Sequence, residues 1–302
     1  MASINSLIIS IMDPKERKLR VLKAFKKWMS EDAYIKSLYR LKVGRELDLI
    51  NPLTFTEKIQ WLKLYDRKPK YTMMQDKYLV REYVSKTIGD VYLIPLLGVW
   101  ERVDDIDFDS LPNQFVLKCN HDCASVIICR DKTSFNVKAA KEKLHRCLKR
   151  DYSIDGGEWA YRDIKRKIIA EQYMHDRNEK TLNDYKFFCF SGKAKIVMIT
   201  SGEAHTKERR LDFYDMDFNP LDIRRGEMLK SGKPTKKPIG IDVLISLAEK
   251  IADGIPFVRV DFYLINGHPY FGEIAFYPSG GFAEFSPHEW EEKIGSWIEL
   301  PV

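Results

Sequence analysis

The residues best suited to chemistry lie in one stretch, 257–281, with the sequence FVRVDFYLINGHPYFGEIAFYPSGG. Arg259 and Asp261 are two residues apart on a strand-like segment whose other face is apolar, and Glu273 follows the turn signal Asn266-Gly267. Two carboxylates and a guanidinium on one patch are the groups needed to hold Mg²⁺ and the phosphates of a nucleotide. The alternative interpretation is a surface hairpin with a salt bridge, because single carboxylates are common on strands.

The register of this hairpin decides whether the three side chains meet, because a shift of one residue moves every side chain to the other face. A two-residue loop at the Asn-Gly turn would pair Asp261 with Gly272 and point Glu273 to the opposite face. A three-residue loop, 265–267, would set Arg259 across from Glu273. We expect the three-residue loop with a left-handed glycine, since of these two registers only it builds a site.

The composition is that of a soluble globular protein, with 302 residues, of which 44% are apolar and 31% charged. The opening run SLIISIM is too short to span a bilayer, and no basic residue precedes it as a secretory signal requires. We therefore expect a cytoplasmic protein. The five cysteines are an odd number without paired CxxC spacing, which favours reduced packing residues over zinc ligands.

The net charge of +6 is concentrated near the N-terminus, where residues 1–50 hold 11 Lys/Arg against 6 Asp/Glu. Because the remainder is almost neutral, we expect no nucleic acid partner. Residues 13–30 predict an amphipathic basic helix with Leu19, Leu22, Phe25 and Trp28 on one face. We expect this face to pack on the core and the basic face to remain outside. A peripheral contact with an anionic membrane, at its inner face, or with a lipid-linked substrate is the alternative use of this helix.

The remaining pattern predicts mixed helices and strands. A capping box at Thr54 and Glu57 marks a helix start. The other expected helices are 32–41, 76–89, 138–149 and 242–252, and the expected strands lie near 94–95, 115–120, 126–129, 167–174 and 186–200. Hairpins without regular alternation of strand and helix indicate an α+β protein with largely antiparallel sheets.

Six motifs follow one another in an order typical of a known fold: DKYLVREYV, FVLKCNHDCAS, IIAEQYM, NDYKFFCFSGK, VRVDFY and GEIAFYPSGG. In this order the sequence resembles the ATP-grasp fold. It looks like the group related to the teichuronopeptide biosynthesis protein TupA, from Asn51 to the C-terminal WIELP. The resemblance implies two α+β lobes whose antiparallel sheets clamp ATP, after an N-terminal helical extension. We expect the extension at 1–50, an N-terminal segment at 51–110, a first lobe at 111–180 and a second lobe with the metal site at 181–302.

The same resemblance implies an ATP-dependent carboxylate–amine ligase that acts through an acyl phosphate. Its implied substrates are ATP, an amino acid or amine, and a uronic-acid carboxylate in the biosynthesis of a surface polysaccharide or capsule. Two other functions stay open. Asp215-Met216-Asp217 suggests a metal-dependent glycosyltransferase, and a non-catalytic nucleotide-binding ATP-grasp protein would keep the fold without turnover.

The resemblance also implies which residues contact ATP. Lys77 and Lys118 would contact its phosphates, which suits point charges. Glu171 would accept a hydrogen bond from a ribose hydroxyl, and Asp184 and Lys186 would form the following polar wall of the cleft. Read alone, each of these side chains is equally consistent with a solvated or paired structural charge.

The metal and catalytic roles fall mainly on the C-terminal hairpin. Asp261 and Glu273 resemble Mg²⁺ ligands, and Arg259 resembles the residue that neutralises the transferring phosphoryl group. We expect Asp261→Asn to reduce turnover while the melting temperature moves little. The expected oxyanion donors are the backbone N–H groups of Ser279, Gly280 and Gly281, with a plain turn as the alternative. A basic loop would grip the acidic substrate, or be merely solvated, and its members are His205, Lys207, Arg209 and Arg210.

Two departures from the family pattern bear on activity. The loop expected to close on the phosphates, 121–125, contains no glycine, and Ser125 is its expected contact to ATP. Asp122 in that loop would repel phosphate unless it turns away. Second, the residue two positions after Glu273 is Ala275, so one oxygen ligand would be replaced by water, which Mg²⁺ tolerates.

Overall fold

The computed structural model describes residues 13–177, 179, 181–202, 206, 208–226, 228–232 and 235–301. Its α-helices are α2 (Pro14–Phe25), α3 (Glu31–Lys42), α4 (Phe55–Tyr65), α5 (Pro69–Gln75), α6 (Val80–Ile88), α7 (Val137–Lys149), α8 (Ser153–Gly156), α9 (Ile241–Ala252) and α10 (His288–Ser296). Its strands are β1 (Leu96–Trp100), β2 (Phe115–Cys119), β3 (Ile127–Cys129), β4 (Ile168–Gln172), β5 (Asp184–Phe190), β6 (Lys193–Ser201), β7 (Arg210–Tyr214), β8 (Pro220–Leu221), β9 (Arg224–Arg225), β10 (Phe257–Ile265), β11 (His268–Ala275) and β12 (Phe285–Ser286). A 3₁₀ turn, η6 (Pro278–Gly281), follows β11.

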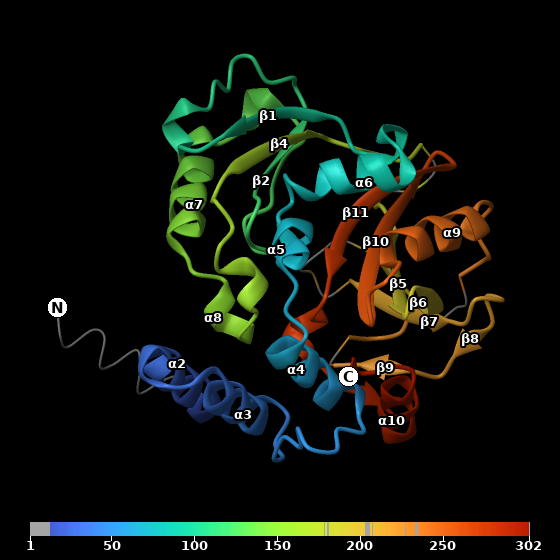
Figure 1. Ribbon diagram of the computed structural model, residues 1–302. Coiled ribbons are helices and arrows are strands. Elements are labelled where there is room, and N and C mark those ends of the chain that lie inside the picture. Colours follow the sequence, from blue (N-terminus) through green and yellow to red (C-terminus); the bar gives the residue numbers. More distant parts are fainter. Residues whose placement is uncertain are drawn as a thin grey trace.

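The strands form two larger sheets, with α5 and α6 between them (Figure 1). The first sheet has the order β1-β4-β2-β3 and the second the order β11-β10-β5-β6-β7-β8. Neighbouring strands in both sheets pair antiparallel. The expected α+β architecture, two antiparallel sheets preceded by a helical segment, is therefore confirmed.

Each sheet has its own core. In the first lobe, Phe115 and Leu117 of β2 pack with Leu144 of α7. In the second, α9 places its apolar face, including Leu244 and Ile251, against β5, β6 and β10. Because β1 pairs with β4, the first sheet begins before residue 111, where the sequence suggested that the first lobe starts.

The helices α4, α5 and α6 were only partly predicted from the sequence. The capping box is present, since the Thr54 side chain accepts from the Glu57 N–H and the Glu57 side chain accepts from the Thr54 N–H. The helix expected at 76–89 is present as α6 and ends at Gly89 as predicted, but its expected start was wrong, because α6 begins only at Val80 and the separate helix α5 precedes it from Pro69. Proline suits the first turn of a helix, where its missing N–H needs no partner. Asp76 instead accepts from the two N–H groups that start the next turn.

The loop of the β10–β11 hairpin has two residues. Ile265 pairs with His268, and the loop residues Asn266 and Gly267 have φ values of 51° and 79°. Positive φ at both positions is what a type I′ turn requires, and Asn-Gly is the sequence best suited to it. The three-residue loop expected from the sequence is therefore wrong.

A β-bulge nevertheless brings the two carboxylates to one face. Phe262 pairs with Phe271, but the next pair is Asp261 with Glu273, so Gly272 is the extra residue of the bulge. A Cβ on Gly272 would lie 3.1 Å from the Asp261 carbonyl oxygen, which explains why glycine suits this position. The bulge thus brings both carboxylates to one face, but the expected pairing of Arg259 with Glu273 is wrong, because Arg259 lies across from Ala275 and Asp261 lies across from Glu273.

The N-terminal helix packs differently from the expectation. Leu19 and Leu22 do contact a small core cluster with α3, but Phe25 and Trp28 are 55% and 67% exposed. The expectation that all four residues would face the core was therefore wrong. Part of the α2 face that lies against the protein carries lysines instead. Lys23, for example, pairs with Asp155 at 2.5 Å.

A buried lysine joins α4 to η6. The Nζ atom of Lys63 donates to the carbonyls of Gly156 at 2.8 Å and Gly280 at 2.6 Å, and to Gln60 Oε1 at 2.7 Å. Burial lowers the pKa of Lys63 to about 7. We assign the charged form, because three acceptors need three N–H bonds and only the ammonium has them. This contact fixes the segment that follows β11.

Gly281 tests how closely η6 must approach α4. Its φ is +73°, and a Cβ there would lie 2.4 Å from Ile59 Cγ2. Gly281→Ala should therefore lower the free energy of unfolding by about 2 to 4 kcal/mol, measured by urea denaturation. The matched control is Gly267→Ala, which has φ +79° but no heavy atom within 4 Å, and should cost only about 1 kcal/mol. Equal losses at the two positions would contradict the close approach.

Candidate active site

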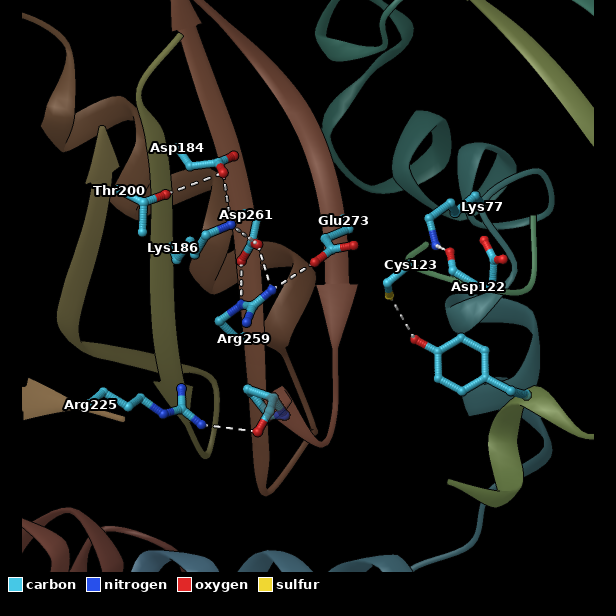
Figure 2. Close-up of polar contacts among 12 residues, drawn as sticks. Lys77, Asp122, Cys123, Asp184, Lys186, Thr200, Arg225, Arg259, Asp261 and Glu273 are labelled. Atoms are coloured by element: carbon cyan, nitrogen blue, oxygen red, sulfur yellow. Dashed lines mark hydrogen bonds and ion pairs between the residues drawn. The ribbon is translucent and has the colours of Figure 1, made fainter. Parts of the chain in front are cut away.

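A cleft of about 740 Å³ lies between the two sheets. The structure brings six of the predicted site residues to its walls: Lys77, Lys118, Asp184, Lys186, Asp261 and Glu273. Figure 2 shows Lys77 and Cys123 across the cleft from Glu273. The cleft therefore combines anionic and cationic side chains from segments far apart in the sequence.

Alternating charges run along the second sheet beneath this cleft (Figure 2). Arg259 donates to Asp261 through Nε and Nη2, both at 2.7 Å, and its Nη2 also donates to Glu273 Oε1 at 2.7 Å. The two carboxylate oxygens bonded to Nη2 therefore lie no more than twice that distance apart.

The row continues onto β5, whose Lys186 is the cross-strand neighbour of Asp261. Lys186 Nζ lies 2.7 Å from Asp261 Oδ2 and 3.1 Å from Asp184 Oδ2. Arg209 then pairs with Asp184 at 2.9 Å. Each charge has a neighbour of opposite sign, which stabilises charges held out of bulk water.

Asp261 and Glu273 differ in burial and in titration. The Asp261 side chain is 2% exposed, and burial raises its pKa against the opposing charges of Arg259 and Lys186. The three N–H donors on its oxygens favour the ionised carboxylate. The Glu273 side chain is 33% exposed. Burial opposes ionisation there too, but Arg259, Lys77 and Lys186 together lower the pKa of Glu273.

The opposite wall carries two lysines with different partners. Lys77 donates through Nζ to the Asp122 carbonyl at 2.5 Å. Lys118 pairs with Glu171 at 2.6 Å, and Arg81 lies 3.4 Å from the same carboxylate. Glu171 thus has two cationic neighbours, so the expected ribose contact would have to share its oxygens.

The loop 121–125, which contains no glycine, is held by hydrogen bonds of its own side chains. The Asp122 carboxylate accepts from the Ser125 N–H at 3.2 Å and from the Ser125 hydroxyl, and both residues are buried. The Ser125 hydroxyl oxygen also accepts from the Cys119 N–H at 2.7 Å. Asp122 therefore turns inward and does not repel phosphate. The Ser125 hydroxyl is thus already bonded within the loop, and the expected contact of Ser125 with ATP stays a prediction.

Cys123 is a cleft residue that its sequence context does not reveal. The loop leaves this cysteine exposed on the cleft wall, with Sγ 4.0 Å from the Tyr161 hydroxyl. Grouping all five cysteines as packing residues was wrong here, since Cys119, Cys129 and Cys189 are buried and Cys123 is not. No sequence signal separates them beyond the position of Cys123 within a polar loop.

Of the basic loop, Arg209 reaches the cleft and Arg210 does not line it. Arg210 lies on β7, opposite Ser201, and its Nη1 donates to the Arg209 carbonyl at 3.0 Å. Of these two arginines, only Arg209 therefore lies where it could contact a substrate in this cleft. His205 and Lys207 lie outside the described residues.

The segment Ser279–Gly281 lies beyond the described lining of the cleft. All three residues have positive φ, 57°, 65° and 73°. Arg225, which the sequence analysis did not single out, helps hold this segment, since Nη2 donates to the Pro278 carbonyl at 3.0 Å (Figure 2). It is buried against Phe285, with 4.9 Å between the guanidinium carbon and the ring centroid.

The donor set fits Mg²⁺ only together with phosphate oxygens. Among the described residues, no group of three or more His, Cys, Asp or Glu could hold a metal ion. Asp261 and Glu273 supply two carboxylates, and Mg²⁺ commonly uses one or two with substrate phosphates and water. Glu273 is the more accessible of the two, whereas both Asp261 oxygens are bonded to cations.

The Asp215-Met216-Asp217 tripeptide has a structural use. Asp215 accepts from the N–H of Asn219 at 2.8 Å and from its side-chain amide at 2.9 Å. It caps the turn between β7 and β8 and is absent from the described lining of the cleft. This geometry does not favour the glycosyltransferase interpretation.

Comparison with known proteins gives one extensive match. Residues 57–299 match the family model described as TupA-like ATPgrasp. No curated protein matches the chain.

Solved structures show weaker likeness. D-alanine–D-alanine ligase from Bacillus anthracis, complexed with ATP, has 14% identity and a TM-score of 0.38, over 68% of this chain and 55% of that ligase. The Helicobacter pylori D-alanine–D-alanine ligase has 14% identity and a TM-score of 0.40, over 82% and 69%. A RimK domain ATP-grasp protein from Sphaerobacter thermophilus DSM 20745 has 13% identity and a TM-score of 0.42, over 77% and 70%. These likenesses are weak, and the match over residues 57–299 alone shows the family. The chain spans about half the length of the first of these ligases.

The geometry changes the expected effect of Asp261→Asn on the melting temperature, which the sequence alone predicted to be small. Removing the Asp261 charge would leave buried Arg259 with only Glu273 and Lys186 with only Asp184 as compensating charges, so we expect the melting temperature to fall by roughly 5 °C or more in calorimetry. Glu273→Gln is the matched control, since it removes a carboxylate from a more exposed position with one bonded oxygen, and should move the melting temperature by less than about 2 °C. Equal shifts would show that Asp261 does not anchor the row.

Proposed function

The chain belongs to the TupA-like ATP-grasp family, and on this premise we propose that it is an ATP-dependent carboxylate–amine ligase acting through an acyl phosphate. The observation that carries the proposal is the bonding of one Arg259 nitrogen to both Asp261 and Glu273, beside a cleft whose opposite wall carries Lys77 and Lys118. Cations on both sides and carboxylates between them suit a nucleotide triphosphate and its metal ion.

In the proposed reaction, a substrate carboxylate attacks the γ-phosphorus of ATP and ADP leaves. Lys77 and Lys118 neutralise charge on the phosphates, and Arg259 lies where charge grows on the transferring group. Bound Mg²⁺ would be held by Glu273 and Asp261 and would supply Lewis-acid stabilisation of phosphate charge. An amine then attacks the acyl phosphate, displacing inorganic phosphate and forming an amide.

The second half-reaction needs donors for a tetrahedral oxyanion. We keep the backbone N–H groups of Ser279, Gly280 and Gly281 as the proposed donors, because Lys63 and Arg225 hold this segment from both sides. The described cleft does not reach them, so the proposal requires the substrate to extend from the cleft toward η6.

We propose a uronic-acid carboxylate as the acyl substrate and an amino acid or amine as its partner, in cytoplasmic assembly of a surface polysaccharide. Arg209 supports an acidic substrate, since it places a cation on the cleft wall beside Asp184. No described helix is long and apolar enough to cross a membrane.

A non-catalytic nucleotide-binding protein is the second candidate. It is favoured by one observation, the saturation of Asp261 by Arg259 and Lys186, which leaves Glu273 as the accessible carboxylate. Such a protein would bind nucleotide in the same cleft without releasing ADP.

Turnover separates these candidates. We expect ADP release when Mg·ATP is supplied with glucuronic or galacturonic acid and a mixture of amino acids, and hydroxamate formation when hydroxylamine replaces the amino acids. Glu273→Gln and Lys77→Met should each lower the rate by about 100-fold or more, because they remove charge that stabilises the transferring phosphoryl group.

The matched control is Lys138→Met on the exposed surface of α7, which should keep full activity. Nucleotide binding without ADP release for any acceptor would favour the non-catalytic protein, and consumption of a sugar nucleotide would favour a transferase.

Occupation of the cleft can be measured without turnover. Cys123 lines the cleft, so saturating Mg·ATP should slow its alkylation by a maleimide about tenfold or more, read peptide by peptide in mass spectrometry. Desolvation by the surrounding cleft walls raises the pKa of Cys123 although its side chain is accessible, so the rate should increase with pH as the thiolate forms. Half-buried Cys147 is the internal reference and should react equally with and without nucleotide. Unchanged alkylation of Cys123 would place the nucleotide elsewhere.

A further inference from the structure

The outer face of α2 is apolar where a surface helix is normally polar. Val21, Phe25 and Trp28 are 53%, 55% and 67% exposed. Val21 and Phe25 lie four residues apart on α2, which puts them on one side of the helix. Trp28 lies in the 3₁₀ turn η1 (Lys26–Trp28) that directly follows α2, and its ring lies 5.4 Å from that of Phe25. We call these three residues the α2 aromatic face. Figure 1 shows α2 at the edge of the molecule, beside α3.

Lysines of α2 and of the following turn η1 make contacts on the protein side. Lys15 donates to the Lys42 carbonyl at 3.3 Å, Lys23 pairs with Asp155, and Lys26 lies over the Tyr34 ring at 5.1 Å. Lysines of this segment therefore make contacts within the protein, whereas two of its aromatic rings are exposed to solvent. Core packing does not explain this arrangement, because burying the rings would be the favourable choice.

Cations flank the α2 aromatic face. Arg17 and Lys18 are exposed one turn before Val21, and Lys27 lies over the Trp28 ring with Nζ 4.1 Å from its centroid. Aromatic rings bordered by lysine and arginine are the pattern of a helix that lies in the interface of an anionic membrane. The rings enter the boundary between headgroups and acyl chains, and the cations remain among the headgroups.

We propose that the α2 aromatic face docks on the surface of an anionic lipid bilayer. The charge of the neighbouring side chains favours an anionic bilayer over a second copy of the chain. Arg17, Lys18 and Lys27 would repel the same face of a second copy. Insertion would bury Val21, Phe25 and Trp28 without unfolding α2, since its contacts with α3 use Leu19 and Leu22. The proposal does not depend on the ligase activity.

Vesicle binding by the full chain tests the proposal. We expect the protein to sediment with vesicles of phosphatidylcholine and phosphatidylglycerol in a two-to-one ratio, to stay in solution with phosphatidylcholine alone, and to dissociate as salt is raised. Subtracting the emission spectrum of Trp28→Phe from that of the wild type isolates the emission of Trp28. The maximum of this difference spectrum should shift to shorter wavelength with the anionic vesicles only.

Two double variants separate the apolar and ionic contributions. Phe25→Ser/Trp28→Ser should weaken binding by about tenfold or more. Arg17→Glu/Lys18→Glu should weaken it by at least about twentyfold, because each juxtamembrane cation contributes about fivefold. The matched controls are Val91→Ser/Ile239→Ser, at other exposed apolar positions, and Lys138→Glu/Lys149→Glu on α7, both of which should bind like the wild type.

Three results would overturn the proposal. The first is equal binding, or none, to anionic and neutral vesicles. The second is a dimer in sedimentation velocity that Phe25→Ser/Trp28→Ser dissociates, which would make a second copy the occupant. The third concerns the apolar run SLIISIM before α2. If Ile8→Asp/Ile9→Asp abolishes vesicle binding while Phe25→Ser/Trp28→Ser retains it, the N-terminal run is the anchor.

Discussion

The site depends on one shared hydrogen-bond donor, Nη2 of Arg259. This nitrogen lies 2.7 Å from a carboxylate oxygen of Asp261 and 2.7 Å from one of Glu273. Two carboxylates held this close repel each other unless a cation lies between them. Arg259 supplies that cation, and Lys186 extends the compensation to β5. The remaining features of the second lobe, its antiparallel strands and the cover of α9, keep this charged row aligned beside the cleft.

This arrangement requires an irregular hairpin. A regular ladder from the two-residue loop would pair Asp261 with Gly272, and Glu273 would face the opposite side of the sheet. The bulge at Gly272 removes that mismatch and aims the Glu273 side chain toward the cleft. A local defect in strand pairing therefore decides whether the two carboxylates can act on one ligand.

The sequence predicted the elements better than the contacts. Asn-Gly marked the turn, and Thr54 and Glu57 marked a helix start, because these signals are local. The order of the motifs along the chain indicated the ATP-grasp family. The bulge, the inward turn of Asp122 and the exposed Phe25 and Trp28 depend on tertiary packing, which no short pattern records. Asp122 shows this clearly: its charge looked unfavourable beside phosphate, yet it bonds to Ser125 within its own loop. The roles of Glu273 and Ser279 in the reaction remain predictions.

The most direct test is a crystal structure with Mn²⁺ and a non-hydrolysable ATP analogue, in which anomalous scattering locates the metal. The account predicts a Mn²⁺ peak at about 2.1 to 2.2 Å from a Glu273 oxygen, with the phosphates between the charged row and Lys77. It also predicts that Arg259 keeps its contact with Asp261. A metal bound elsewhere, with Glu273 facing only solvent, would contradict the central claim.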